Sequence, residues 1–224
     1  MANYVTEIDL SISQKVKKEV TNAYLNGTLV DHKGFVWVRR DKLHSILRTT
    51  KVNANYYWVN IESKYKINFN NIDYVRGFKV VELLARRIEE DGVGKKGANL
   101  EASKFMYDQI NTCEVVKLLR LEYNLSVKEE RRTLKQRRIR LYKIEADELT
   151  GELLIKKSAE FSHIRSASIY RDRCTDIENG LIVNYETHRI ITSHEINHEE
   201  QLLSLCKEQG WKTDWYDEYK KFYR

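Results

Sequence analysis

The stretch EFSHIRSASIYRDRCTDIENGLIVNYETHRII, residues 160–191, decides which fold we expect for the C-terminal part of the chain. It contains two short segments that we interpret as strands, Glu160–Ile164 and Leu181–Val183, and a long loop separates them. A helix is expected from about Tyr185, directly after the second run. The stretch therefore predicts the order strand, loop, strand, helix.

Three polar residues in this stretch suit one kind of chemistry. Asn179 follows His163 by 16 residues, and His188 follows Asn179 by 9. Hydrolysis of a phosphodiester needs a general base that takes a proton from water, and a neutral imidazole with a pKa of about 6.5 can do this at neutral pH. The reaction also needs a Lewis acid that stabilises charge on the scissile phosphate. The two histidines could meet these two needs.

These residues and spacings resemble the HNH, or ββα-metal, nuclease family over about residues 147–191. The match is best with the branch that has a small residue before the first histidine and Asn-Gly-Leu at the entry to the second strand. The resemblance implies that His163 is the general base and that His188 holds a divalent ion, Mg²⁺ or Mn²⁺. It implies that Asn179 braces the loop between the strands or orients His163 through its carbonyl.

The position before the base departs from the family pattern. Many members place an aspartate there as a second metal ligand, whereas this chain has Ser162, and a neutral hydroxyl is a poor ligand for a hard cation. Glu160 lies on the same face of an extended strand as Ser162 and could supply the carboxylate, with Asp176 as another candidate. The zinc-binding CxxC pairs of the family are also missing, so the unit must be held by packing. The apolar residues available for this are Ile164, Leu181, Val183, Ile190 and Ile191.

The net charge of +6 is concentrated in one segment. Residues 128–143 hold eight basic and two acidic side chains, which accounts for the whole excess. Because Lys and Arg neutralise phosphates, we expect this segment to contact DNA, although a solvated helix face would have the same composition. The candidates for DNA contact are Arg131, Arg132, Lys135, Arg137 and Arg138, together with Arg165 in the loop after the first strand.

The composition excludes several classes of protein. No apolar run approaches the roughly 18 residues that a membrane-spanning helix needs. The first residues lack the pattern of a signal peptide, and the three cysteines, Cys113, Cys174 and Cys206, form neither a disulfide framework nor a zinc knuckle. These features favour a soluble cytoplasmic protein.

The N-terminal part mixes helical and hairpin patterns. Helices are predicted over Ile8–Tyr24, Asp41–Arg48, Val80–Glu89 and Leu100–Tyr123, and hairpins over Thr28–Val38 and Tyr56–Phe69. Ser126, with Glu129 three residues later, has the signature of a capping box, which predicts that a separate basic helix starts there and ends near Arg138. A strand over 139–144 and a hairpin turning at Thr150-Gly151 are expected next.

The expected fold is therefore α+β with two domains. Residues 1–140 form a DNA-recognition domain that ends in the basic helix, and residues 141–224 form an HNH-type unit followed by a helical tail over His198–Tyr223. The tail's aromatic residues are expected to pack on that unit. They are Trp211, Trp215, Tyr216, Tyr219 and Phe222.

Two further motif matches are rejected. Residues 92–97 fit GxGxxG, but a helix rather than a strand precedes them, so they predict a connection between helices and no nucleotide cofactor. Residues 194–198 fit HExxH, the zinc motif of metalloproteases. Asn197 and Glu200 look instead like the cap of a new helix, which would leave His194 in a loop.

The function expected from the sequence is that of a DNA endonuclease of the restriction, homing or phage type, with a homodimer favoured where both strands are cut. A non-catalytic regulator or inhibitor on the same fold is the alternative, and a zinc protease is the third possibility.

Overall fold

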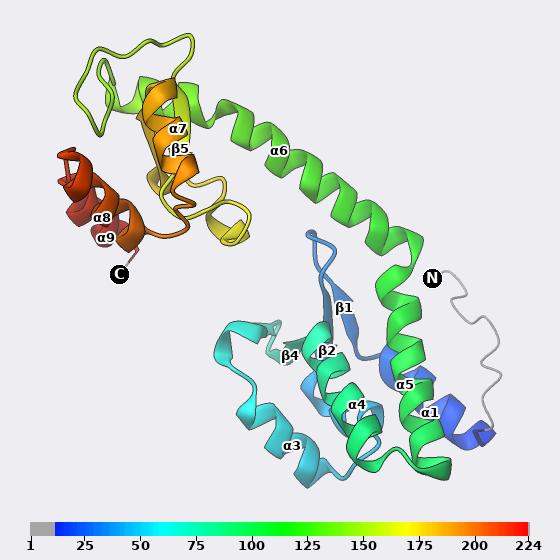
Figure 1. Ribbon diagram of the computed structural model, residues 1–224. Coiled ribbons are helices and arrows are strands. Elements are labelled where there is room, and N and C mark those ends of the chain that lie inside the picture. The colour runs from blue at the N-terminus through cyan, green and yellow to red at the C-terminus, as the bar shows by residue number, and fades with distance from the viewer. Residues whose placement is uncertain (1–11, 224) are drawn as a thin grey trace. The chain divides into compact units, whose positions relative to one another are not determined.

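The computed structural model describes residues 12–223 and shows an α+β protein in which helices predominate (Figure 1). The chain divides into two compact units, Met1–Tyr123 (unit 1) and Asn124–Arg224 (unit 2). The division falls inside a helix and earlier than the expected position near residue 140, so the basic segment belongs to unit 2. Within the described range, no helix combines the length and apolar character needed to cross a membrane.

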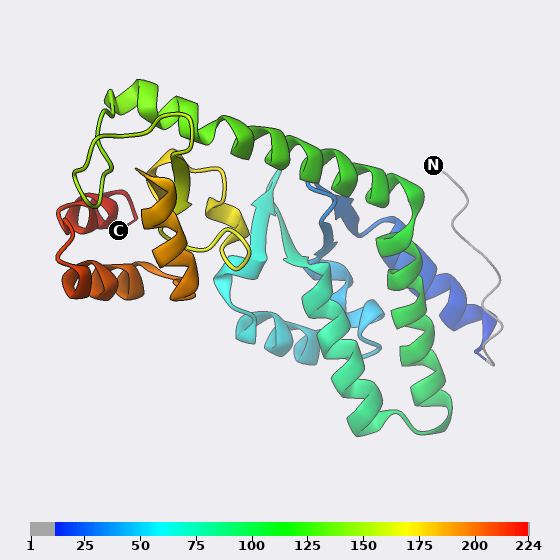
Figure 2. The same cartoon turned by 45° about the horizontal axis from the view of Figure 1, so that its top comes forward.

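Unit 1 is built around a four-stranded antiparallel sheet with the strand order β1-β2-β4-β3. In Figures 1 and 2, α4 and α5 lie side by side as an antiparallel pair. The elements are α1 (Gln14–Leu25), β1 (Thr28–Val30), β2 (Val36–Arg39), α2 (Leu43–Ile46), α3 (Lys51–Asn60), β3 (Lys66–Phe69), β4 (Ile72–Arg76), α4 (Gly77–Asp91) and α5 (Gly94–Thr112), with 3-10 turns at Arg40–Lys42 and Ser63–Tyr65.

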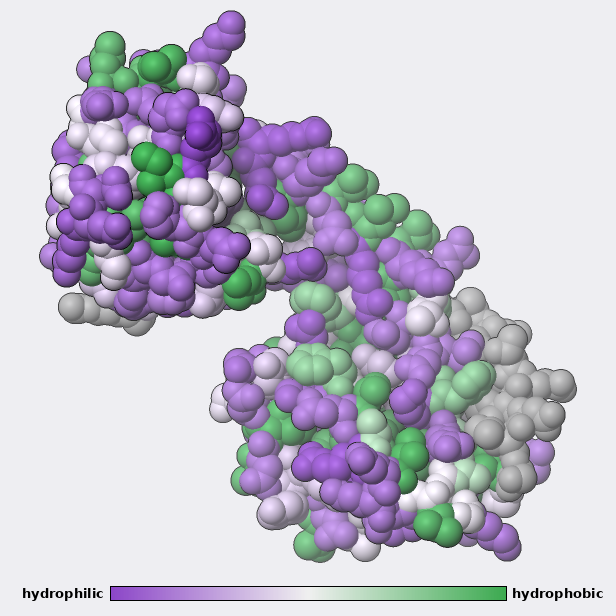
Figure 3. Space-filling view, viewed as in Figure 1, coloured by the Kyte–Doolittle hydropathy of each residue, from purple (hydrophilic) through white to green (hydrophobic). Residues whose placement is uncertain are grey.

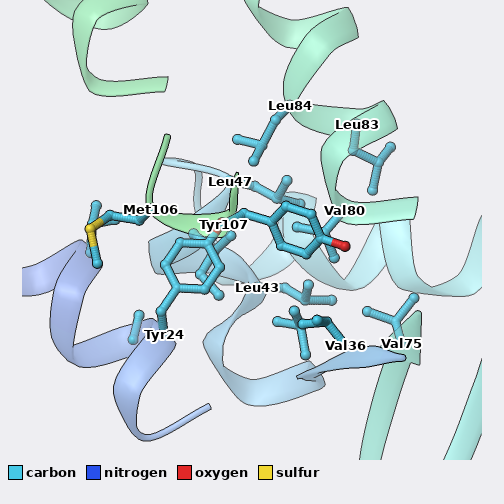
Figure 4. Close-up of a cluster of buried hydrophobic side chains, with 14 of the residues drawn as sticks. Tyr24, Val36, Leu43, Leu47, Val75, Val80, Leu83, Leu84, Met106 and Tyr107 are labelled. Atoms are coloured by element: carbon cyan, nitrogen blue, oxygen red, sulfur yellow. The ribbon is translucent and has the colours of Figure 1, made fainter. Parts of the chain in front are cut away.

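The core of unit 1 joins the sheet to its helices (Figure 4). Tyr24 of α1 and Leu84 of α4 are fully buried, and Val75 of β4 lies with them in one cluster. The buried Ser103 side chain is paired, since its hydroxyl donates to the carbonyl of Ile46 at 2.6 Å. This packing fixes α2 in the interior.

One predicted hairpin of unit 1 is correct and one is wrong. Strands β1 and β2 pair as expected, and the Asp31 carboxylate stabilises their turn by accepting from the backbone amides of Lys33 and Phe35. The hairpin predicted over Tyr56–Phe69 is instead the end of α3 followed by β3, which pairs with β4. The alternation of apolar residues therefore gave a wrong prediction of strands. The residues are helical, with Ala54 buried, and Thr50 caps the helix by accepting from the amide of Asn53. Residues 8–11 of the first predicted helix lie outside the described residues.

The basic segment forms part of a single long helix, α6 (Glu114–Tyr142). The predicted start at Ser126 and the predicted strand over 139–144 are therefore wrong, and the predicted helix over Leu100–Tyr123 is divided at Cys113 instead. Serine is tolerated inside a helix whose neighbours are strong helix formers, so a capping-box pattern alone does not start one. The C-terminal half of α6 packs into unit 2 through Leu134, which is fully buried.

Unit 2 contains the predicted order of strand, loop, strand and helix. Its elements after α6 are β5 (Glu160–His163), β6 (Gly180–Val183), α7 (Tyr185–Ser193), α8 (Glu199–Gln209) and α9 (Trp215–Phe222), with 3-10 turns at Arg171–Arg173 and Ile177–Asn179. β5 and β6 are antiparallel, and α7 lies beside them (Figures 1 and 2). Near the turn at Thr150-Gly151, only an isolated bridge joins Ala146 to Leu153.

The helical tail packs onto this unit as predicted. Trp215 and Tyr219 are buried in one cluster with the apolar residues expected to hold the unit together, and Trp211 and Tyr216 pack against it. Phe222 departs from the prediction, because 59% of it is exposed.

Candidate functional site

The pairing of β5 with β6 decides which side chains share a face. His163 lies opposite Gly180, and Ser162 opposite Leu181. Because side chains alternate along a strand, Phe161 and His163 point to one face, and Glu160 and Ser162 to the other. The rings of Phe161 and His163 are in edge contact, with centroids 5.0 Å apart. A Cβ at position 180 would overlap the Phe161 ring, so glycine is required opposite the histidine.

The His163 ring is partly buried and is held by a backbone carbonyl. Its Nε2 donates to the oxygen of Cys174 at 3.0 Å. A carbonyl oxygen only accepts, so Nε2 carries the proton and Nδ1 is the unprotonated nitrogen of the neutral ring. Burial lowers the pKa of His163 below 6.5 and outweighs the hydrogen bond to Cys174, which raises it. The ring is therefore neutral at neutral pH and offers Nδ1 as a base.

An arginine and a second histidine lie near this imidazole. Arg131 on α6 and His188 on α7 both act electrostatically to lower the pKa of His163. Arg131 is exposed, and the amide of His188 donates to the carbonyl of Asn184 at 3.0 Å, which places His188 in the first turn of α7. The structure thus brings together His163, His188 and one arginine of the basic segment, an arrangement that suits an anion such as phosphate.

Asn179 is fully buried and fastens the loop between the strands. Its Oδ1 accepts from the amide of Arg165 at 2.9 Å, and its Nδ2 donates to the carbonyls of Arg165 and Arg173, both at 3.1 Å. Both ends of the loop are therefore tied to one side chain. The ring of His163 is oriented by Cys174, which lies in this loop, so Asn179 acts on the histidine through the loop.

The residues expected to complete a metal site do not gather at His163. Ser162 is 3% exposed and lies on the opposite face of β5, together with Glu160, which is exposed. Asp176 accepts a hydrogen bond from the Tyr223 hydroxyl at 3.1 Å. Among residues 12–223, the one group of three His, Cys, Asp or Glu side chains close enough to share an ion is His198, Glu199 and Glu200, with ligand atoms within 4.8 Å of one another. The donors near His163 therefore do not fit a preformed site for Mg²⁺ or Mn²⁺, which prefer several oxygens.

The group at His198 is already neutralised by cations. Glu199 is 1% exposed and accepts from Arg165 at 2.6 and 2.5 Å, and also from Lys220 at 3.1 Å. Burial raises the pKa of Glu199, but the hydrogen bonds from Arg165 and Lys220 outweigh it and lower the pKa to about 2. An ion here would have to displace both cations. We interpret the cluster as an ionic link among the loop, α8 and α9.

The basic residues of unit 2 fall into two classes. Arg138 is buried and donates to both carboxylate oxygens of Glu148, at 2.9 and 2.7 Å, and Arg165 is bound to Glu199. The prediction that these two contact DNA is therefore corrected, because internal carboxylates already hold them. Lys135 is half-buried, and its ammonium donates to the carbonyl of Lys157 at 3.4 Å. The exposed candidates are Arg131, Arg132 and Arg137, of which Arg132 pairs with Glu129.

The two rejected motifs lie where the sequence analysis expects them. Gly92–Gly97 connects α4 to α5, which begins at Gly94. α7 ends at Ser193 and Glu195 has a φ of 50°, so the helix that a zinc protease needs does not continue through His194 and His198. His198 is the N-cap of α8, one residue after the cap predicted at Asn197.

Sequence reasoning missed two groups that support the site. Asp147 is fully buried and accepts from the amides of Leu149, Thr150 and Asn184 and from the Thr187 hydroxyl, thereby joining its own turn to the start of α7. An Asp two to four residues before Thr-Gly is a recognisable turn signal. The carbonyl of Cys174 carries no such signal, because every residue has one.

No family model, curated protein or solved structure matches this chain. The resemblance to HNH nucleases therefore rests on its own residues.

Proposed function

We propose that unit 2 hydrolyses phosphodiester bonds of DNA, with His163 as the general base. The observation that carries this proposal is the bond from Nε2 of His163 to the Cys174 carbonyl. It leaves Nδ1 unprotonated on a ring whose pKa is lowered by burial, so the ring is ready to take a proton from water. A base of this kind is needed for hydrolysis.

The neighbouring cations support a phosphate ester as the substrate. Arg131 and His188 lie close enough to act on His163 electrostatically. Arg131 can hold a phosphate of the backbone while water is activated by His163. A divalent ion would supply Lewis acidity, and His188 is the candidate ligand for it here.

One observation favours a second function. No carboxylate accompanies His163 and His188 in a group of three donors anywhere in residues 12–223. A protein that kept the fold and lost the metal would bind DNA or a protein partner without cutting it. This is the non-catalytic alternative.

A cleavage assay separates the two functions. Supercoiled plasmid and mixed genomic DNA are incubated with the full chain in the presence of Mg²⁺, Mn²⁺ or EDTA, and nicked and linear products are measured. Cleavage is expected for the wild type and for His198→Ala, which changes another histidine of unit 2, and is lost in His163→Ala. Absence of products from every DNA tested, or equal cleavage by His163→Ala, would overturn the proposal.

A further inference from the structure

Helices α2 and α3 of unit 1 form a helix-turn-helix arrangement. α2 ends at Ile46, residues 47–50 turn the chain, and α3 begins at Lys51. Leu43 and Ile46 of α2 are fully buried, which places that helix inside the core. In contrast, α3 is anchored along one side only, where Ala54 and Ile61 are buried. The second helix is therefore presented at the surface of the unit, which is the geometry of motifs that insert a helix into DNA.

The outward side of α3 carries apolar and amide side chains. Val52, Tyr56 and Val59 recur at helical spacing and are 79%, 67% and 65% exposed. Asn53 and Asn60 lie beside them and are also exposed. In Figure 3, hydrophobic residues lie among hydrophilic ones at the surface around α3. A solvated helix face would hold charged residues instead, so this stripe is built for contact with a partner.

The surroundings of this stripe are strongly positive. Residues 39–79 contain nine Lys and Arg residues and three Asp and Glu residues. Arg40 and Lys66 lie over the two-ring side chain of Trp58, at 5.2 and 5.0 Å from its centroid, so the β3–β4 hairpin brings a cation to α3. Lys51 is exposed in the first turn of the helix. The charge complements a polyanion rather than another protein surface of ordinary composition.

We propose that α3 lies in the major groove of duplex DNA and reads base edges. An α-helix with side chains is about 10–12 Å wide and fits a groove of about 12 Å. Asn53 can bond adenine through its amide, and Val52 and Tyr56 can contact the methyl group of thymine. Lys51 and Lys66 hold the phosphates. The proposal concerns binding alone and does not rest on the cleavage proposed for unit 2.

Binding is tested with the full chain in EDTA, so that hydrolysis plays no part. Duplexes with a random central region are selected for binding at about 50 mM salt, and the affinity for the enriched duplex is measured against salt concentration. Lys51→Glu is compared with Lys15→Glu, an exposed position on α1 with the same change of charge. We expect Lys51→Glu to weaken binding about 10-fold and to lower the salt slope by about 1, with Lys15→Glu close to wild type.

Base reading is tested by the double variant Asn53→Ala/Tyr56→Ala. Both side chains are exposed, so the fold is expected to be kept, which circular dichroism checks. The preference for the enriched duplex over a scrambled one is expected to fall about 10-fold. The proposal is overturned if no duplex is enriched, if single strands or RNA bind more tightly than duplex, if Lys15→Glu weakens binding as much as Lys51→Glu, or if the folded double variant keeps the preference.

Discussion

Two regions of unit 2 bring histidine together with charged groups, and they differ in what their charges already bind. At the start of α8, Glu199 and Glu200 lie beside His198 and hold Arg165 and Lys220. Around His163 the neighbouring charges that lower its pKa belong to Arg131 and His188, and the ring is neutral. The first region has the composition of a metal site and the contacts of a structural link. The second has an unprotonated nitrogen with a basic surrounding, which is what hydrolysis of a phosphate ester needs.

The largest effect is expected on the rate of DNA cleavage, where variants of His163 and His198 can be compared directly. Replacing His163 by alanine removes the proposed base, and loss of a general base lowers a rate by about 100-fold or more. His198→Ala removes a histidine that is bonded only to Glu200 at 3.0 Å and leaves the base intact. Initial rates of plasmid nicking measure both variants. Equal losses in the two variants would show that the regions do not differ in function.

Sequence patterns predicted the ββα part of unit 2 well and α6 poorly. β5, β6 and α7 were predicted from local patterns, since two short strand-like segments are followed directly by a helical one. The start and end of α6 were missed because Ser126 and the apolar residues 139–144 have local patterns that the longer helix overrides. Local signals fail where tertiary packing, here of Leu134 and Arg138, decides the outcome.

Two neighbouring arginines of α6, Arg137 and Arg138, show the same contrast between an exposed charge and one that is already bound. Arg138 has a side chain 9% exposed and binds Glu148, which is 20% exposed. Arg138→Ala leaves this carboxylate without its cation, with the amide of Ile182 still donating to it, and is expected to lower the free energy of unfolding by about 3 kcal/mol. Arg137→Ala changes an exposed neighbour and is expected to stay within about 0.5 kcal/mol. Denaturant unfolding measures both, and similar losses would remove the distinction between the two arginines.

The ionic link at α8 is expected to contribute less, because its cations reach water. The side chains of Arg165 and Lys220 are 26% and 37% exposed, so both are partly solvated when Glu199 is removed. We expect Glu199→Ala to cost about 2 kcal/mol of stability and Glu200→Ala about 0.5 kcal/mol or less. A cluster that bound a metal instead would make the wild type more stable when Mg²⁺ or Zn²⁺ is added, and thermal unfolding with and without these ions detects this.

The site itself could be predicted only in part from the sequence. His163, Asn179 and His188 were found because their spacing is characteristic, and the structure brings the two histidines close enough for His188 to lower the pKa of His163. The partner of His163 is a backbone carbonyl, and the partner of Arg165 lies 34 residues away on α8. Neither contact can be recognised from a local sequence pattern. The sequence therefore could not distinguish arginines that are free to bind DNA from arginines that are bound to internal carboxylates.

The smallest effect is expected in the acid range and concerns the Glu199 link. Its pKa is about 2 in the folded protein and is expected near 4.5 when the chain is unfolded. Because the folded pKa is depressed, the stabilisation is complete above pH 4.5 and is lost as the pH falls toward 2. Glu199→Gln has no carboxyl to titrate at this position, so its stability does not share this loss. The difference in unfolding free energy between wild type and Glu199→Gln should therefore narrow by about 1 kcal/mol between about pH 6 and about pH 4. A difference that stays constant over this range would mean that Arg165 and Lys220 do not hold Glu199 ionised, and the contrast with the neutral ring of His163 would then disappear.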